Sequence, residues 1–343
     1  MHRVCVIEGD GIGQEVIPAA VEVLQATGAP VRFAWAEAGW ECFQKKGTAL
    51  PEATLEMARS SDAILFGATA SPSHPVAGYV SPILTLRQTL DLYANLRPTR
   101  SWPLPGCRPG VDLLVVRENT EGLYVRRERS DGETAVAERV ITRRASQRVV
   151  RRACELARAR QGRLTIVHKA NVLSQTCGLF RQVALEVVAE FPGLEVEELL
   201  VDTAALRLAQ DPTRFDVLVT TNLFGDILSD EAAGLVGGLG LAASANVGEG
   251  AGLFEPVHGA APDIAGRGIA NPLAAILSGA LMLRHLGEGE AAARVEAAVE
   301  QVLAEGLRTP DLGGQAATAE VTAAVAQAVG STHRRARGER RVG

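Results

Sequence analysis

The sequence is poor in aromatic residues, in histidine and in closely spaced cysteines. Phe, Trp and Tyr make up 4% of the 343 residues, so any core must be largely aliphatic. The five cysteines form an odd number and never stand in a Cys-x-x-Cys spacing, which indicates reduced thiols in a cytoplasm and excludes a disulfide framework. The six histidines show no metal-ligand spacing, which excludes a histidine-based metal site.

Long hydrophobic runs and an excess of positive charge are missing as well. Gly or Pro interrupts the longest uncharged stretches, as between residues 268 and 283, so we expect no transmembrane helix. The first apolar run begins at Arg3, which leaves no room for a signal peptide. The net charge of −5 does not indicate a nucleic-acid-binding protein. We therefore expect a cytoplasmic protein whose partners include neither a membrane nor nucleic acid, and whose 47% hydrophobic residues bury a large core.

The chain does contain apolar strand patterns that alternate with helical patterns, the order of an α/β protein, and its length favours two domains. A glycine-rich stretch follows the first strand. Its residues Gly9, Gly11 and Gly13 do not have the G-x-G-x-x-G spacing, so we reject a Rossmann phosphate loop. The predicted strands are Val4 to Ile7, Val31 to Ala36, Ala63 to Gly67, Leu113 to Val116, Leu164 to Val167, Glu195 to Val201 and Val217 to Thr221, and the predicted helices are Gln14 to Thr27 and Ser146 to Arg160.

An acidic pair follows the last of these strands. Asp226 and Asp230 stand four residues apart in what we predict to be the first turn of a helix, so their carboxylates share one face. They repel each other by roughly 0.2–0.5 kcal/mol unless a cation or a basic group joins them. Mg²⁺ or Mn²⁺ would take one or two carboxylates and leave positions for substrate oxygens. The alternative is a solvated acidic helix start, which the helix dipole favours.

Basic residues occur at other predicted element ends. Arg87 and Arg97 lie in one stretch, and Arg117 follows a strand directly. Guanidinium groups bind carboxylates in a bidentate manner, so three arginines that converge near a metal would bind a substrate with more than one carboxylate. Lys169 follows another strand, where burial and flanking positive charge would make it a useful base. Each arginine, taken alone, is more often a surface ion-pair partner, and Lys169, on this stretch alone, is more often a surface lysine.

Six stretches, taken in order, resemble a known family. They are Glu8 to Gly13, Leu86 to Pro98, Arg117 to Tyr124, Lys169 to Leu173, Asn222 to Asp230 and Phe254 to Gly259. From Val4 to about Val329, the chain resembles the β-decarboxylating dehydrogenases, which comprise isocitrate, 3-isopropylmalate, homoisocitrate and tartrate dehydrogenases. The resemblance implies oxidative decarboxylation of a small 2-hydroxy-carboxylate substrate with NAD and with Mg²⁺ or Mn²⁺.

The resemblance also implies the fold, with two discontinuous domains around a central, mostly parallel sheet. Residues 1–98 plus 247–330 would form the first domain, with the cofactor loop, and residues 99–246 the second. Residues 125–141 resemble the arm by which two subunits clasp in a homodimer or a tetramer. Beyond the resemblance, residues 331–343 are rich in arginine and have no apolar face, so we predict a disordered basic tail.

Roles carry over from the family residue by residue. Lys169 would remove the hydroxyl proton, and Tyr124 would protonate C3 after CO₂ leaves. The site would be shared, with Lys169 and Asp202 supplied by one subunit and the metal aspartates Asp226 and Asp230, the arginines and Tyr124 by the other. The expected metal ligands are Asp202, Asp226 and Asp230, the substrate residues are Ser81, Ile83, Leu84, Arg87, Arg97, Arg117 and Asn171, and the cofactor residues are Glu255, His258, Gly259, Ala260, Asp263, Ile264 and Asn271.

Three residues bear on which acid is the substrate. Glu121 resembles the isocitrate and homoisocitrate branches, whereas isopropylmalate enzymes usually have glycine there. Ile83 and Leu84 should face the substituent on C3, and both are apolar where isocitrate enzymes often have asparagine and some homoisocitrate enzymes arginine. We rank homoisocitrate first, oxidised to 2-oxoadipate and CO₂ in lysine biosynthesis through aminoadipate. Isocitrate, 3-isopropylmalate and dual specificity remain open.

The loop around Asp263 and Ile264 favours NAD over NADP. Bacterial NADP-dependent isocitrate dehydrogenases resemble this loop but carry lysine and tyrosine at these two positions. A carboxylate accepts hydrogen bonds from both ribose hydroxyls of NAD and repels the 2′-phosphate of NADP. One rival is a metal-dependent carboxylate-binding protein, which would leave Lys169 and Tyr124 without a role. The other is a dehydrogenase of phosphorylated hydroxy-amino acids, whose metal site would need histidines.

Overall fold

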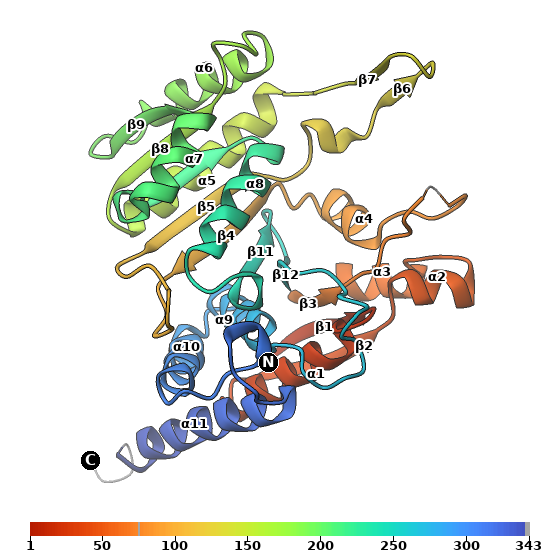
Figure 1. The fold of residues 1–343 in the computed structure, drawn as a ribbon, viewed down its shortest axis with the longest axis vertical. Coiled ribbons are helices and arrows are strands. Elements are labelled where there is room, and N and C mark those ends of the chain that lie inside the picture. The colour runs from red at the N-terminus through yellow and green to blue at the C-terminus, as the bar shows by residue number, and fades with distance from the viewer. Residues whose placement is uncertain (75, 340–343) are drawn as a thin grey trace.

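The computed structural model describes residues 1–74 and 76–339, which form one ten-stranded mixed sheet with helices packed against it (Figure 1). Three neighbouring pairs, β12–β11, β11–β4 and β4–β5, are antiparallel, and the other pairs are parallel. In sheet order the strands are β2 (Val31–Ala36), β1 (His2–Gly9), β3 (Ala63–Ala68), β12 (Gly252–Pro256), β11 (Ala243–Val247), β4 (Ala94–Arg100), β5 (Asp112–Glu118), β10 (Val217–Thr220), β8 (Arg163–His168) and β9 (Glu195–Leu200).

The expected α/β fold with a mostly parallel sheet is confirmed. All seven predicted strands are present, and their ends differ from the prediction by two residues at most. The apolar runs of the five inner strands are buried, as parallel strands require, whereas the edge strands β2 and β9 are partly exposed. The exception in detail is Val201, which begins a helix instead of ending β9. Sequence reasoning missed β4, β11 and β12, whose buried faces carry polar side chains that interrupt the apolar pattern.

Helices α1 and α9 pack against the half of the sheet around β3 and β12, and α5 packs against β5, β8 and β10. Both predicted helices are present, with α5 starting three residues early because the Thr142 hydroxyl oxygen caps the amide of Ala145 at 3.1 Å. The α-helices are α1 (Gly13–Ala26), α2 (Trp40–Lys46), α3 (Glu52–Arg59), α4 (Pro82–Thr89), α5 (Arg143–Ala159), α6 (Thr176–Val188), α7 (Val201–Gln210), α8 (Asn222–Gly234), α9 (Leu273–His285), α10 (Gly289–Ala304) and α11 (Thr318–Glu339), with short 3-10 turns at η1 (Leu123–Val125), η2 (Pro212–Arg214), η3 (Leu239–Leu241) and η4 (Pro310–Leu312).

The glycine-rich opening serves close packing. Gly9 and Gly11 have φ angles of +76° and +56°, which favour glycine. A Cβ on Gly9 would lie 2.0 Å from the carbonyl oxygen of Ala68, and one on Gly11 would lie 2.1 Å from that of Ala260. The amide of Ile12 also donates to Ala260 at 2.9 Å. These glycines therefore let the end of β1 contact both β3 and the expected cofactor loop.

The expected arm contains a two-stranded hairpin, β6 (Glu128–Ser130) and β7 (Ala135–Ala137), which projects from the body (Figure 1). Every residue of both strands is exposed. The expected domain cut falls inside β4 and β11, which lie side by side in the sheet, and the division into two domains remains a prediction.

The expected disordered tail is wrong for residues 331–339, because α11 continues to Glu339. Residues 340–343 lie outside the described residues. In the described part of the chain, no helix has the length and hydrophobicity needed to span a bilayer.

Candidate active site

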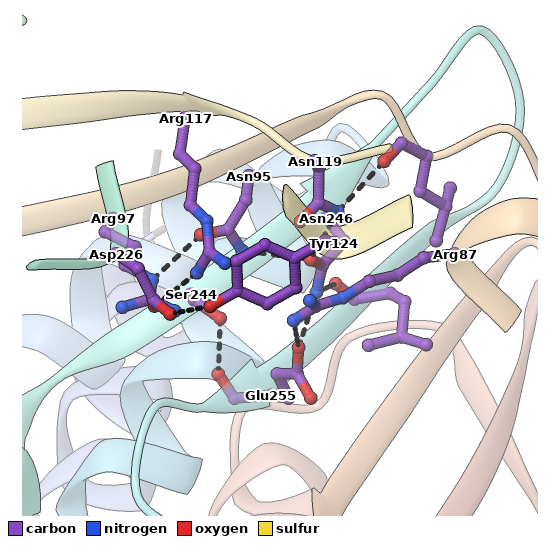
Figure 2. A network of polar contacts seen from close by, with 12 residues as sticks. Arg87, Asn95, Arg97, Arg117, Asn119, Tyr124, Asp226, Ser244, Asn246 and Glu255 are labelled. Atoms are coloured by element: carbon purple, nitrogen blue, oxygen red, sulfur yellow. Dashed lines mark hydrogen bonds and ion pairs between the residues drawn. The ribbon is translucent and has the colours of Figure 1, made fainter. Parts of the chain in front are cut away.

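The polar side chains of the predicted site meet where β4, β5 and α8 come together (Figure 2). Asn95 of β4 lies directly opposite Arg117 of β5, and Arg97 follows two residues later on the same face of the sheet. Helix α8 approaches β5 closely because Gly225 has no side chain: a Cβ there would lie 2.7 Å from the Cβ of Arg117. This contact places Asp226, the next residue, beside the guanidinium groups of Arg97 and Arg117.

Asp226 is the centre of this cluster. One of its oxygens accepts a hydrogen bond from Arg117 and forms an ion pair with Arg97 at 3.1 Å, and the other accepts a hydrogen bond from the Tyr124 hydroxyl group of η1. Arg97 also binds Asp230 at 2.8 Å and therefore bridges the acidic pair. Arg117 is held from behind by Asn222, whose side-chain oxygen accepts from Nε at 3.0 Å and from Nη2 at 2.7 Å.

The expected position of the acidic pair needs correction. Helix α8 begins at Asn222, so Asp226 and Asp230 stand beyond its first turn, and a helix-dipole origin for them is wrong. Of the two kinds of partner expected for the pair, a cation or a basic group, the chain supplies the basic groups, since Arg97 and Arg117 neutralise it. A metal at this pair is therefore not required by charge repulsion.

Burial and charge shift the pKa values in this cluster. Burial alone would raise the pKa of Asp226, but Arg117, the Tyr124 hydroxyl group and Arg97 outweigh it and hold the pKa below its ordinary value. Burial and the neighbouring Asp226 raise the pKa of Asp230. Burial and the hydrogen bond to Asp226 raise the pKa of Tyr124, which keeps its proton in place at neutral pH. Burial lowers the pKa of Arg117 to about 10, so this guanidinium stays charged.

Arg87 of α4 belongs to an adjoining pocket. Its guanidinium binds Glu255 of β12 at 2.8 Å, and its buried Nε has no partner among the described residues. Ser81 is the residue before α4, and Leu84 does not line the pocket. The pocket is lined by Phe66, Gly67, Ala68, Thr69, Ile83, Arg87, Arg97, Ser244, Glu255, Pro256, Val257, His258 and Gly259.

The expected cofactor loop borders the same pocket. Burial lowers the pKa of His258, and its ring atom Nε2 is buried with no partner in the described part of the chain. Asn271 donates to Asp311 at 3.0 Å and accepts from the amide of Leu273 at 3.0 Å. Asp263 is exposed and makes neither a hydrogen bond nor an ion pair with the described residues. An unpaired ring nitrogen at the pocket and an exposed, unpaired carboxylate in the same loop are compatible with a bound dinucleotide.

Lys169 and Asp202 form a separate pair. Lys169 lies directly after β8 and donates to Asp202, in the first turn of α7, and this hydrogen bond lowers the pKa of Asp202. Within one chain the described partner of Lys169 is thus a carboxylate, and the expected flanking positive charge stays a prediction. Asn171 is exposed nearby. Within the described residues no hydrogen bond or ion pair joins Lys169 or Asp202 to Asp226 or Tyr124.

The acidic residues of one chain supply only part of a metal site. In the described part of the chain no group of three or more His, Cys, Asp or Glu side chains could hold a metal, so Asp202 does not join the pair on α8. Asp230 is half exposed, and only one of its oxygens is paired among the described residues. Two carboxylates with an open oxygen suit Mg²⁺ or Mn²⁺, which takes its remaining ligands from water and substrate. The residues therefore fit the expected ion.

Sequence reasoning missed four asparagines of this network, of which Asn95, Asn222 and Asn246 hold the arginines or link them and Asn119 bonds to Asn246. Asn95, Asn119 and Asn246 are buried in or beside the central strands, and Asn222 begins α8. The usable signal is the alternation of polar residues at Asn95 and Arg97, and again at Ser244 and Asn246, which places each pair on one face of a strand.

Comparisons with known proteins agree with this arrangement. The model of the isocitrate/isopropylmalate dehydrogenase family matches residues 3–329. Over 331 residues the chain is 58% identical to the isocitrate/homoisocitrate dehydrogenase of Thermus thermophilus, covering 96% of this chain and 99% of the relative. It is 53% identical over 337 residues to the 3-isopropylmalate/3-methylmalate dehydrogenase of Methanocaldococcus jannaschii, covering 96% and 99%. The crystal structure of isocitrate dehydrogenase from Methylococcus capsulatus matches with a TM-score of 0.92 and 46% identity, covering 96% of this chain and 100% of that chain.

Proposed function

The chain belongs to the isocitrate/isopropylmalate dehydrogenase family and is a β-decarboxylating dehydrogenase, and we propose that it oxidises homoisocitrate with NAD to 2-oxoadipate and CO₂ in the cytoplasm. Isocitrate is the second candidate, because the relative from Thermus thermophilus is named for both acids. The observation that carries the proposal is the meeting of Arg97 and Arg117 at Asp226, next to the Tyr124 hydroxyl group. Arg87 and Arg97 line the pocket, and Arg117 shares Asp226 with Arg97, so three cations lie close enough together to suit an acid with several carboxylates.

The chain's own residues bind the acid and move its protons. Arg97 and Arg117 would exchange their bonds to Asp226 and Asp230 for bonds to the substrate carboxylates. Arg87 would keep Glu255 and bind the substrate through N–H groups that Glu255 leaves free. Tyr124, whose proton is firmly held, would donate it to C3 when CO₂ has left. A divalent cation held by Asp226 and Asp230 would supply a Lewis acid at the C2 oxygen. NAD at the loop that includes His258 would supply the hydride acceptor.

The base, Lys169, is proposed to act in the site of a second subunit. It and Asp202 pair with each other and have no link to Tyr124 within the described chain. Exposed apolar residues stand on the neighbouring segments: the side chains of Val172 after β8, Leu206 of α7 and Ile227 of α8 are 67%, 58% and 57% exposed. Large exposed apolar residues beside half of a site support a homodimer that buries them. The protruding β6–β7 hairpin would clasp the partner.

The substrate is tested by initial rates of NADH formation with homoisocitrate, isocitrate and 3-isopropylmalate. We expect the highest kcat/KM with homoisocitrate. A higher value with 3-isopropylmalate than with both other acids would contradict the proposal.

The variant Ile83→Asn tests the pocket itself, because Ile83 lines it beside Arg87. An amide can bond to the free carboxylate of isocitrate but leaves an isopropyl group beside an unpaired polar group. We expect the ratio of kcat/KM for isocitrate to that for 3-isopropylmalate to rise about tenfold. Leu84→Asn, one position along the same helix, is the matched control and should shift the ratio less. Equal shifts would place Leu84 in the pocket, and an unchanged ratio in both variants would remove α4 from recognition of the C3 substituent.

The proposed NAD preference rests on Asp263, whose carboxylate is exposed and unpaired among the described residues. It can accept from the ribose hydroxyl groups of NAD and would repel the 2′-phosphate of NADP. The double variant Asp263→Lys, Ile264→Tyr should therefore shift the ratio of kcat/KM for NADP over NAD by about a hundredfold or more. Arg267→Lys, in the same loop, is the control and should leave the ratio unchanged. An unaltered enzyme that uses NADP at least as well as NAD would show that Asp263 has another role.

A further inference from the structure

A chain of buried side chains connects Arg87 with Arg97 (Figure 2). Glu255 accepts hydrogen bonds from Arg87 and from the side-chain nitrogen of Asn246, each at 2.8 Å. The oxygen of Asn246 accepts from the side-chain nitrogen of Asn95 at 2.9 Å. The oxygen of Asn95 accepts from Nε of Arg97 at 2.8 Å. Hydrogen bonds thus run without a break between the two guanidinium groups.

We propose that Asn95 and Asn246 are positioning residues that fix the separation and orientation of Arg87 and Arg97 for two carboxylates of one substrate molecule. The proposal rests on the proposed function, in which both arginines bind the acid. Both asparagines have an exposed fraction of 0% and neither lines the pocket, so they act on substrate only through the arginines. We call this path the asparagine relay.

The register of the sheet explains how the asparagine relay forms. Asn246 of β11 lies directly opposite Asn95 of β4, and Asn95 lies opposite Arg117 of β5. Side chains opposite each other on neighbouring strands share one face and are within reach of each other. Glu255 stands on β12, the strand on the other side of β11. The two arginines, one on a helix and one on a strand, are therefore connected through the rigid middle of the sheet.

The donors and acceptors of the relay match in only one arrangement. The nitrogen of Asn246 donates to Glu255 and, at 3.2 Å, to the carbonyl of Leu253, while its oxygen accepts from Asn95 and, at 3.0 Å, from Asn119. A flipped amide would put nitrogen against two nitrogens and oxygen against two oxygens. Because an unpaired buried polar group is costly, this matching opposes any independent rotation of one member. A shift of Arg87 is thus transmitted to Arg97.

The test compares Asn95→Ser with Asn119→Ser. Asn119 is a matched control: it is buried, it donates to the same oxygen of Asn246, and it lies off the path between the arginines. We expect Asn95→Ser to raise KM for the hydroxy acid about tenfold, with KM for NAD within about twofold of the unaltered value. Asn119→Ser should lower the melting temperature by as much as Asn95→Ser does, but it should leave the KM for the hydroxy acid and the KM for NAD unchanged. Equal rises in KM for the acid in the two variants would overturn the proposal.

A second measurement reads the coupling itself. In the otherwise unaltered enzyme, the kcat/KM of the double variant Arg87→Lys, Arg97→Lys should differ by about fivefold or more from the value that the product of the two single effects predicts. In the Asn95→Ser background, the double variant should match that product. Asn95→Asp serves if the serine variant does not fold, because it keeps an acceptor for Arg97 and removes the donor to Asn246. Equal coupling in both backgrounds would show that the asparagine relay does not connect the two arginines, and it would leave the proposed function untouched. Absence of turnover of every tested acid by the unaltered enzyme would instead overturn the proposed function.

Discussion

Asp226→Asn should reduce kcat/KM roughly a hundredfold to a thousandfold and weaken the binding of Mg²⁺ or Mn²⁺. One oxygen of the carboxylate accepts from Arg117 and forms an ion pair with Arg97, and the other accepts from Tyr124, so an amide must turn its NH₂ group toward one of these cationic or hydroxyl groups. The change also removes one of the two charges proposed to hold the cation. Activity of the unaltered enzyme should vanish in excess chelator and return with added Mn²⁺.

Asp91→Asn is the control for this experiment. Asp91 also binds two arginines, Arg148 and Arg144, but it lies outside the candidate active site. Its variant should keep the activity and the metal affinity of the unaltered enzyme. Full turnover by Asp226→Asn, or full turnover in excess chelator, would show that the proposed metal site is wrong.

The fold could be predicted where the sequence is apolar. The runs that form β1, β3, β5 and β10 are buried on both sides, and their lack of polar residues made them recognisable. The strands β4, β11 and β12 were missed because they carry Asn95, Asn246 and Glu255 into the interior. Hydrophobic periodicity fails at these positions because hydrogen bonds between side chains replace apolar burial there.

The sequence indicated which residues belong to the candidate site, but it did not indicate most of the contacts that these residues make. The structure brings Arg97, Arg117 and Asp226 together, as their positions at element ends suggested. The sequence could not show that the arginines already neutralise the acidic pair, because this depends on the register of β4 and β5 and on the contact at Gly225. The expectation of an enzyme, and not of a carboxylate-binding protein without catalysis, is confirmed by family membership.

Within one chain the site residues lie in two groups, a division that the resemblance to the family implied and that the pattern of residues alone did not indicate. Tyr124 binds Asp226 in one group, and Lys169 binds Asp202 in the other. A base must lie within hydrogen-bond reach of the proton that it removes, either directly or through one water. If one chain alone formed the site, Lys169 would have to cross the gap between the groups. A symmetric dimer removes this difficulty, because each subunit can supply the lysine group to the other.

Mixing two inactive variants should therefore restore activity. Lys169→Ala lacks the proposed base and Tyr124→Phe lacks the proposed acid, and each homodimer should lose activity about a hundredfold or more. A hybrid dimer has one site with both residues intact and one site with neither. Complete exchange of equal amounts should return about a quarter of the unaltered activity, since half of the dimers are hybrids. Lys169→Ala mixed with Asp202→Asn is the matched control, because both changes affect the same half of the site and every site in the hybrid stays defective. Exchange demonstrated by mass spectrometry with no recovery of activity in the first mixture, or with equal recovery in both, would show that the site is not shared between subunits.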